Sequence, residues 1–384
     1  MTNIKAYNLG QIKEADIELG DFTVFVGPQA SGKSILLQMM KLAEDRSGIK
    51  SLMIKHGFQW NNDIGEFLEL YLGEGMSSVF NNNTKLFLSD EEFEFNKINY
   101  VGVEQKEKLF YIPAQRVLSI PNGWPKPFES YEMRDPYVLK RFSEHLRKML
   151  DFLGSRNIEL LTALDNIKKP FQDKIYEEIF VNAKIELDKE SPRNRIMLKF
   201  QNNLFPYMAW SSGQKEFGPL LLGIYYLESI LMFKKSPDGD YVVIEEPEMG
   251  LHPKAIQALL AFLLYLVTKG YKVIVSTHSP VILELSWAVR TMQELKASPD
   301  NLQTLFEMNK YNDKELNEIF ANILQHKNFK SYYFNRKPEG VFTQDISSLD
   351  PGTDDDNIAD WGGLTSFGTR ASEIISNLVA KNGI

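Results

Sequence analysis

Residues 27–34 have the types and the spacing that bind phosphate groups. They are Gly27, Pro28, Gln29, Ala30, Ser31, Gly32, Lys33 and Ser34, in the pattern G-x4-G-K-[ST]. In such a loop the backbone N–H groups and the positive end of the following helix hold a β-phosphate, while the lysine reaches the β- and γ-phosphates. The serine hydroxyl binds Mg²⁺. The loop therefore predicts binding of a nucleoside triphosphate, with Lys33 acting in its hydrolysis.

A second candidate lies at residues 241–248, where four apolar residues end in adjacent carboxylates. Glu245 can ligate Mg²⁺, directly or through water, and Glu246 can orient and polarise an attacking water. Alone, the segment would be interpreted as a buried strand that enters a solvated acidic turn. Beside a phosphate loop, the hydrolytic interpretation is favoured. Glu248, which follows the proline, is expected to be only a loop charge.

Four small or polar residues precede a long apolar segment and form a third candidate: Ser211, Ser212, Gly213 and Gln214. Such a turn at a helix N-terminus can bind an anion through the Ser211 hydroxyl and the Ser212 and Gly213 amides. The alternative is an ordinary helix cap, because serine is a favoured cap residue. Taken alone, the segment favours the cap.

These motifs follow one another in a definite order, with two more between and after them. Gln115 stands in Y-I-P-A-Q-R before the serine pair, and His278 stands in S-T-H-S-P after the carboxylates. The whole order, from residue 27 to residue 280, resembles the head of an ABC-class ATPase. Within that class it resembles the OLD-like and SMC-like bacterial ATPases more than transporter cassettes. Alone, Gln115 would be interpreted as a surface glutamine and His278 as a capping residue.

The resemblance implies roles for these residues. Gln115 would lie near Mg²⁺ and the attacking water, and His278 would contact the γ-phosphate. Two copies of the chain would bind head to tail, so that Ser211–Gln214 of one copy face the ATP held by the other. This arrangement implies a homodimer or higher homo-oligomer closed by ATP. The signature departs from the usual S-G-G-Q, and Glu245 stands where aspartate is commoner; both variants suit the OLD-like branch.

The resemblance also suggests what such a switch controls. OLD proteins carry a TOPRIM nuclease domain after the ATPase, whereas Asp354–Asp356 here is interpreted as a solvated acidic loop. The expected effector is therefore a separate nuclease or toxin, as in two-component antiviral systems such as Septu and PARIS. The alternative is a RecF-like ATPase of DNA repair or DNA ends, so a nucleic-acid partner stays open. A candidate contact for nucleic acid is the basic stripe Arg134, Lys140, Arg141, Arg147 and Lys148.

The elements that must position these residues alternate between strand and helix. Apolar runs at 22–26, 241–244 and 272–276 predict strands, and periodic segments at 33–43 and 253–268 predict helices. This alternation predicts an α/β fold, a mostly parallel sheet flanked by helices. The resemblance adds an ABC-type P-loop ATPase head with an antiparallel β lobe and a helical insertion. Further strands are expected at residues 98–103, in a hairpin at 183–187 and 195–200, and in a hairpin at 331–335 and 341–346.

The chain is expected to form a single ATPase domain over 1–384. Its expected parts are an N-terminal lobe (1–127) with the phosphate loop and Gln115, a helical insertion (128–190), a C-terminal lobe (191–300) with the other motifs, and a C-terminal extension (301–384).

Composition narrows the classes of protein. The 384 residues include no cysteine, which excludes a disulfide framework, a thiolate zinc site and a cysteine nucleophile. The longest apolar run, residues 217–233, is interrupted by Glu228 and falls short of the roughly 20 residues of a membrane span. With no signal segment visible, we expect a cytoplasmic protein without a membrane partner. The net charge of −8 argues against a protein that coats nucleic acid through its global field.

Overall fold

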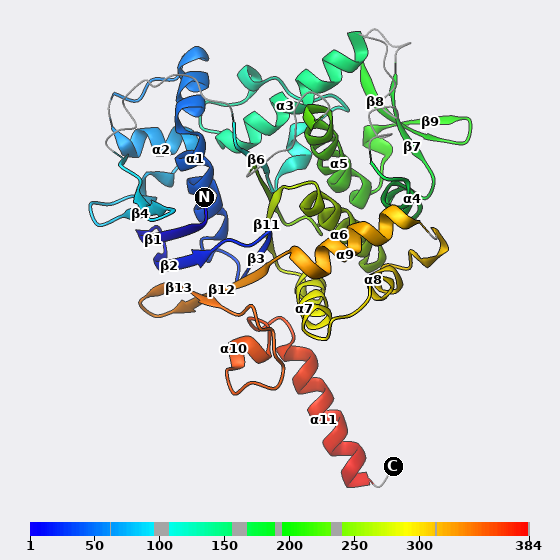
Figure 1. Cartoon of the computed structure of the whole chain (residues 1–384). Helices are drawn as coiled ribbons and strands as arrows, with labels where there is room; N and C mark the ends of the chain where they lie inside the picture. Colours follow the sequence, from blue (N-terminus) through cyan, green and yellow to red (C-terminus); the bar gives the residue numbers. More distant parts are fainter. Residues whose placement is uncertain are drawn as a thin grey trace.

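The computed structural model describes residues 1–61, 63–95, 107–155, 167–188, 194–231, 240–311 and 313–382. The predicted strand at 98–103 and the turn at 191–193 lie outside these ranges. A ten-stranded mixed sheet runs through the centre of the molecule, in the order β5-β4-β1-β2-β13-β12-β3-β11-β10-β6 (Figure 1). Its strands are β1 (Asn3–Leu9), β2 (Ile12–Glu18), β3 (Phe22–Val26), β4 (Lys85–Leu88), β5 (Glu91–Glu92), β6 (Leu109–Ile112), β10 (Tyr241–Glu245), β11 (Lys272–Thr277), β12 (Phe329–Lys337) and β13 (Gly340–Asp345).

Five neighbouring strands of this sheet run parallel. β6, β10, β11, β3 and β12 pair in parallel, with Val243 opposite Tyr111 and Val24 opposite Val275. All residues of β3 and of β10 are buried, as expected for parallel strands covered on both faces. Because their carboxyl ends meet at one edge of the sheet, the loops that begin at Gly27, Glu246 and His278 start side by side.

Helices cover both faces of the sheet. They are α1 (Lys33–Lys55), α2 (Ile64–Leu72), α3 (Tyr137–Ser155), α4 (Lys169–Glu178), α5 (Ser212–Leu231), α6 (Pro253–Thr268), α7 (Pro280–Glu294), α8 (Pro299–Leu305), α9 (Lys314–His326), α10 (Asp356–Ala359) and α11 (Ser366–Asn382). One apolar core packs α1 and α2 on one face, and another packs α3 to α7 and α9 on the other face. No helix in the described ranges has the length and apolar character needed to cross a membrane.

A second, antiparallel sheet consists of β7 (Lys184–Asp188), β8 (Arg195–Phe200) and β9 (Asn203–Pro206). The predicted hairpin is present, with Ile185 opposite Leu198. Together with the helices α3 and α4, this sheet forms the upper right of Figure 1. The predicted fold class is confirmed: an α/β chain with a mostly parallel sheet flanked by helices, an antiparallel β lobe and inserted helices.

The hairpin predicted near the end of the chain lies in the middle of the main sheet. β12 pairs in parallel with β3, and β13 pairs in parallel with β2, so the hairpin joins these two strands. Gly27 packs against it: a Cβ at this position would lie 2.9 Å from the Phe334 carbonyl oxygen. The range 301–384, expected as an extension, therefore helps to position the phosphate loop. The boundaries at 127, 190 and 300 stay predictions.

Helix α1 bends where it meets the start of β6. Asp45 leaves the helical conformation, with φ −114° and ψ 21°. Its carboxylate instead accepts hydrogen bonds from the backbone N–H groups of Lys108 (2.8 Å) and Leu109 (3.1 Å). Lys41 Nζ, one turn earlier, also donates to Asp45 Oδ2 (2.8 Å). These bonds join the helix that follows the phosphate loop to the edge strand of the sheet.

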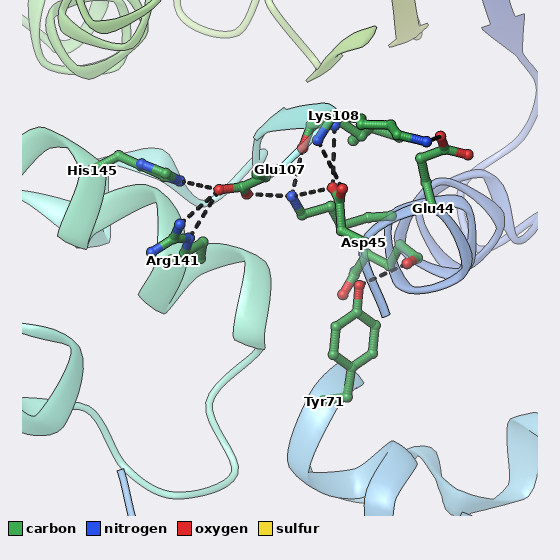
Figure 2. Close-up of polar contacts among 10 residues, drawn as sticks. Glu44, Asp45, Tyr71, Glu107, Lys108, Arg141 and His145 are labelled. Carbon is green, nitrogen blue, oxygen red and sulfur yellow. Dashed lines mark hydrogen bonds and ion pairs between the residues drawn. The ribbon is translucent and has the colours of Figure 1, made fainter. Parts of the chain in front are cut away.

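Glu107 extends this contact to helix α3 (Figure 2). Its carboxylate pairs with Lys41 and with Arg141, whose Nη2 lies 2.7 Å from Oε2, while His145 Nε2 lies 3.0 Å from the same oxygen. We call Lys41, Asp45, Glu107, Arg141 and His145 the Glu107 cluster. Lys41 and Arg141 hold the pKa of Glu107 well below its usual range against the opposing effect of burial. The cluster ties α1, β6 and α3 together at the amino end of β6.

Candidate active site

The carbonyl groups of the phosphate loop surround the side chain of Lys33. Lys33 is 6% exposed, and its Nζ donates to the carbonyl oxygens of Gly27 (2.8 Å) and Pro28 (3.1 Å). Burial lowers the pKa of Lys33 to about 8, although Glu246 and Glu245 oppose this shift. A poorly solvated cation held by neutral groups, here the two carbonyl oxygens together with the Ser31 hydroxyl (3.5 Å) and His278 Nε2 (3.4 Å), is ready to exchange them for phosphate oxygens.

The loop needs glycine where it enters helix α1. Gly32 has φ 93°, and a Cβ there would lie 2.7 Å from Ile12 Cγ1. Ser34, in the first turn of the helix, is exposed toward solvent. Both observations agree with the predicted strand, loop and helix around residues 27–34.

Glu245 ends β10 as a buried carboxylate. It is 3% exposed, and its Oε2 accepts a hydrogen bond from the Ala114 N–H (3.3 Å). Burial raises the pKa of Glu245, and the hydroxyls of Ser34 and Tyr111 lie close enough to oppose this shift. Yet no hydrogen bond of regular geometry reaches Oε1 from any described residue. A buried, unpaired carboxylate oxygen beside a serine hydroxyl fits a hard cation such as Mg²⁺. Gln115, directly after Ala114, is exposed at this edge of the sheet.

Glu246, the next residue, meets His278 and the region of Lys33. Its backbone has φ 44°, an uncommon value for a residue with a side chain, and its N–H donates to the Ser276 carbonyl (2.9 Å). Its Oε1 lies 3.3 Å from His278 Nε2, which lies 3.4 Å from Lys33 Nζ. Burial raises the pKa of Glu246 to about 8, and the nearby Glu248 adds to the shift. Burial also lowers the pKa of His278.

Glu248 is part of the same site, so the expectation of a simple loop charge is wrong. Its Oε1 accepts hydrogen bonds from the Thr277 hydroxyl and from the His278 N–H (3.1 Å). Its Oε2 is buried and has no partner among the described residues. The acidic turn thus holds the backbone that carries His278. In the sequence, the place of Glu248 directly after a proline does not indicate this contact.

Arg116 is a further site residue that sequence reasoning missed. It is fully buried, and each of its nitrogens reaches a backbone carbonyl: Nε of Glu216 (2.9 Å), Nη1 of Glu245 (2.9 Å) and Nη2 of Glu246 (3.0 Å). It therefore joins the segment after Gln115 to the end of β10 and to helix α5. A lone arginine next to a glutamine has no motif spacing that marks a role in the site, so the sequence did not reveal this role.

The four signature residues form a regular helix cap. Ser211 N–H donates to Gln214 Oε1 (3.0 Å), and Gln214 N–H donates to Ser211 Oγ (3.3 Å), a reciprocal pair at the start of α5. Ser211 and Ser212 are exposed. Gly213 packs on the loop after the carboxylates, since a Cβ there would lie 2.6 Å from the Gly250 carbonyl oxygen. Within the described ranges no hydrogen bond links these residues to 27–34, so their anion-binding role stays a prediction.

The basic stripe considered for nucleic acid is paired within the protein. Lys140 is 1% exposed and donates to the Met133 carbonyl (2.8 Å), and Arg147 lies 2.7 Å from Asp151. The other three also contact carboxylates: Arg134 contacts Glu69 and Glu74, Arg141 contacts Glu107, and Lys148 contacts Glu144. These residues therefore do not form a free cationic face.

The acidic residues 354–356 also have local roles. Asp355 caps α10 by accepting from the Asn357 N–H (2.9 Å), and its other oxygen accepts from Gln344 Nε2 (2.7 Å). In the described part of the chain, no group of three His, Cys, Asp or Glu side chains is disposed to hold a metal.

Two comparisons with known sequences found matches to parts of this chain. A family model described as "AAA domain, putative AbiEii toxin, Type IV TA system" matches residues 138–284, which include the signature, the carboxylates and His278. The Old nuclease of Escherichia phage P2 is 42% identical over 57 residues, which cover 15% of this chain and 10% of that protein. The match thus spans about a tenth of the length of this curated relative.

Solved structures with a similar chain path include heads of SMC proteins. An SmcHead bound to the C-winged helix domain of ScpA gives a TM-score of 0.45 at 11% identity and covers 90% of this chain and 96% of that chain. The SMC head domain from Thermotoga maritima gives 0.37 at 12% identity and covers 90% and 98%. The sheet topology, the phosphate loop and the carboxylates beside it define an ABC-like P-loop ATPase domain.

Proposed function

We propose that this chain is a Mg²⁺-dependent ATP hydrolase that dimerises around ATP and thereby switches a separate effector. One observation carries the proposal. Three side chains from different parts of the sequence meet at the carboxyl edge of the sheet: His278 Nε2 lies 3.4 Å from Lys33 Nζ and 3.3 Å from Glu246 Oε1. A cation, a carboxylate and an imidazole in this arrangement suit transfer of a phosphoryl group to water.

The residues divide the work of hydrolysis. Lys33 leaves the carbonyls of Gly27 and Pro28 and binds the β- and γ-phosphates. Glu246 accepts a hydrogen bond from the attacking water and, in its ionised form, takes the proton of that water. His278 binds the γ-phosphate and holds it near this water. Glu248 and Arg116 keep the backbones of His278 and Glu246 in place.

Ser34, Gln115 and Glu245 would hold Mg²⁺. The unpaired Oε1 of Glu245 beside Ser34 supports this assignment. When bound, the ion neutralises charge on the β- and γ-phosphate oxygens. The choice of ATP over other nucleotides follows from the family resemblance, because no described residue reads the base.

A second copy of the chain would complete the site. Ser211–Gln214 lie at the start of helix α5, and among the described residues their links to the active site of their own chain are indirect: Gly213 packs against Gly250, and Arg116 donates to the Glu216 carbonyl. We propose that the exposed serines bind the ATP of the partner copy in a head-to-tail homodimer or higher homo-oligomer. Closure of this dimer would be the signal.

The effector would be a nuclease or toxin carried by another protein in bacterial antiphage defence. Support comes from the two sequence matches, one named for a putative toxin and the other for a nuclease. The RecF-like alternative would need a surface for nucleic acid, and the candidate basic stripe is already paired. Purification from the native host with identification of bound proteins by mass spectrometry tests the proposal. Isolation without a nuclease or toxin, together with strong stimulation of hydrolysis by DNA, would refute it.

Hydrolysis and dimerisation are tested directly on the purified chain. We expect phosphate release from ATP with Mg²⁺ and none with EDTA. We also expect Glu246→Gln with ATP to elute at twice the monomer mass in light-scattering chromatography, and to return to the monomer mass without nucleotide. A chain that hydrolyses ATP but stays monomeric in this variant would refute the switch and leave the hydrolase.

A further inference from the structure

Arg336 lies against the phosphate loop although it is far from every motif in the sequence. It stands near the end of β12, the strand that pairs with β3 on the side opposite β11. Its Nη2 donates to the carbonyl oxygens of Gln29 (2.7 Å) and Ala30 (2.9 Å). The loop is therefore flanked by His278 on one side and by Arg336 on the other.

A second donor reaches the same carbonyl group. Gln11, in the turn between β1 and β2, donates its Nε2 hydrogen to the Ala30 oxygen (2.9 Å). This turn is in turn held by the β12–β13 hairpin, because Val341 N–H donates to the Gln11 carbonyl (2.9 Å). Ala30 itself has φ 53°, a left-handed conformation that is costly for a residue with a Cβ. Arg336 and Gln11 together hold this conformation.

The direction of these carbonyl groups decides where the loop amides point. The peptide bonds are trans, and in a planar trans peptide the C=O of one residue and the N–H of the next point in opposite directions. Since the Gln29 and Ala30 oxygens point outward to Arg336, the N–H groups of Ala30 and Ser31 point the other way. No described group accepts a hydrogen bond from either amide. Two amides aimed in this way form the concave anion site that a phosphate needs.

The charge of Arg336 also reaches the site. It is close enough to lower the pKa of Lys33, whose Nζ lies within the loop. Both bonds come from one nitrogen of a planar guanidinium that stays charged at any physiological pH.

We infer that Arg336 is a positioning residue for the nucleotide: it fixes the Gln29 and Ala30 peptides so that their amides bind the triphosphate, and it adds a positive charge beside the triphosphate. This inference rests on the proposed function. It assigns the hairpin at 329–345 a direct part in nucleotide affinity and none in the chemical step.

Steady-state hydrolysis of ATP by the full chain tests the inference. We expect Arg336→Ala to raise KM about tenfold and to leave kcat within about twofold, because the loop amides are disordered while Glu246 and His278 are untouched. Arg336→Lys should recover part of the loss. The affinity for Mg-ADP should be lowest in Arg336→Ala, intermediate in Arg336→Lys and highest in the wild type. Arg336 is exposed, so both variants should fold like the wild type.

Lys337→Ala is the matched control. Lys337 is the next residue, is also exposed and carries the same charge, but its ammonium lies over the Phe342 ring. We expect its KM to stay within about twofold of wild type, since only long-range charge is lost. Equal KM values for Arg336→Ala and Lys337→Ala would overturn the inference alone. So would a loss of kcat at unchanged KM. A wild-type chain that binds no nucleotide would overturn the proposed function as well.

Discussion

Buried charged side chains lie at both ends of the short strand β6, but those at one end are paired with one another and those at the other end are not. At its amino end the Glu107 cluster pairs Lys41 with Asp45 at 2.8 Å and Glu107 with Arg141 at 2.7 Å (Figure 2). At its carboxyl end lies the candidate active site, where Glu245 Oε1 has no hydrogen-bond partner among the described residues and Lys33 Nζ donates to carbonyl groups. In the first region each charged side chain has a partner of opposite charge within the chain, whereas in the second Glu245 Oε1 has no hydrogen-bond partner among the described residues.

This difference separates stability from function. A buried charge pair adds little net stability, but removal of one partner is costly because it leaves the other uncompensated. Buried polar atoms without partners weaken the folded state until a ligand supplies the missing contacts. We therefore expect variants of the Glu107 cluster to lose stability with affinity intact, and variants of the active site to lose function with stability intact.

The largest effect should come from Glu246→Gln. Loss of the carboxylate that draws the proton from water should lower kcat about a thousandfold, with KM near the wild-type value. The free energy of unfolding should stay the same or rise, because a buried carboxyl close to Glu248 is removed. Phosphate release and urea unfolding measure both. Glu339→Gln, an exposed carboxyl in the hairpin turn, should change neither; unchanged turnover in Glu246→Gln would remove this residue from the mechanism.

Lys41→Met should have the next largest effect, which is a loss of stability and not of activity. The variant keeps the volume of a side chain that is 1% exposed but leaves Asp45 and Glu107 without their shared cation. We expect the free energy of unfolding to fall by about 3 kcal/mol. KM for ATP should not change.

Lys5→Met is the control for this variant. Lys5 also pairs with an aspartate, Asp90 at 3.0 Å, but in a solvent-exposed position. Its loss should be hard to resolve in urea unfolding. If both lysine variants behaved alike, burial would not be the cause, and the distinction between the two regions would lose its basis.

The sequence predicted the elements around the active site well because their signals are local. A buried run such as 22–26 and the periodic segment 253–268 each have one stable way to bury their apolar residues, and the structure places β3 and α6 there. Order along the chain then brings the loops to one edge of a parallel sheet. The place of the β12–β13 hairpin was not predictable in this way, because neither its length nor its pattern says which strands it joins.

The site residues that were missed share one property. Arg116, Glu248 and Arg336 act through backbone carbonyls or amides and not through a recognisable spacing. A backbone partner leaves no mark in the sequence, so these residues read as ordinary surface charges. Lys33, Glu245, Glu246 and His278 could be predicted because phosphate and water chemistry demands particular side chains at particular places.

Lys33→Ala tests whether the active site binds the phosphates of ATP through this lysine. The lysine makes hydrogen bonds to the phosphates with a charged donor, each worth about 1.5–3 kcal/mol. We expect the affinity for ATP to fall about a hundredfold or more, with no loss in the free energy of unfolding, since the removed cation is poorly solvated. Fluorescence titration with labelled ATP measures the affinity. Lys13→Ala, an exposed lysine that donates to Asn8, should bind as wild type; a Lys33 variant that does the same would contradict the assigned role.

The smallest effect is a pH dependence of the Glu107 cluster. Burial lowers the pKa of His145 to about 4 from an ordinary value of 6.5. Below pH 6.5 the unfolded chain therefore binds a proton that the folded chain refuses, and the free energy of unfolding falls until the pH reaches about 4. The loss between pH 7 and pH 5 should be about 2 kcal/mol. The titratable groups that face this imidazole are Glu107, Arg141, Lys41 and Tyr226.

Urea unfolding at pH 7, 6 and 5 measures this dependence, and His145→Asn isolates it. The variant cannot be protonated in this range, so its free energy of unfolding should change less from pH 7 to pH 5 than that of the wild type, by about 2 kcal/mol. His326→Asn, in the exposed last turn of α9, should keep the wild-type slope. Parallel slopes for the wild type and His145→Asn would show that His145 takes up its proton as readily in the folded chain as in the unfolded chain, and is charged below pH 6.5. The Glu107 cluster would then carry a net positive charge and, like the candidate active site, would lack an anion to balance it.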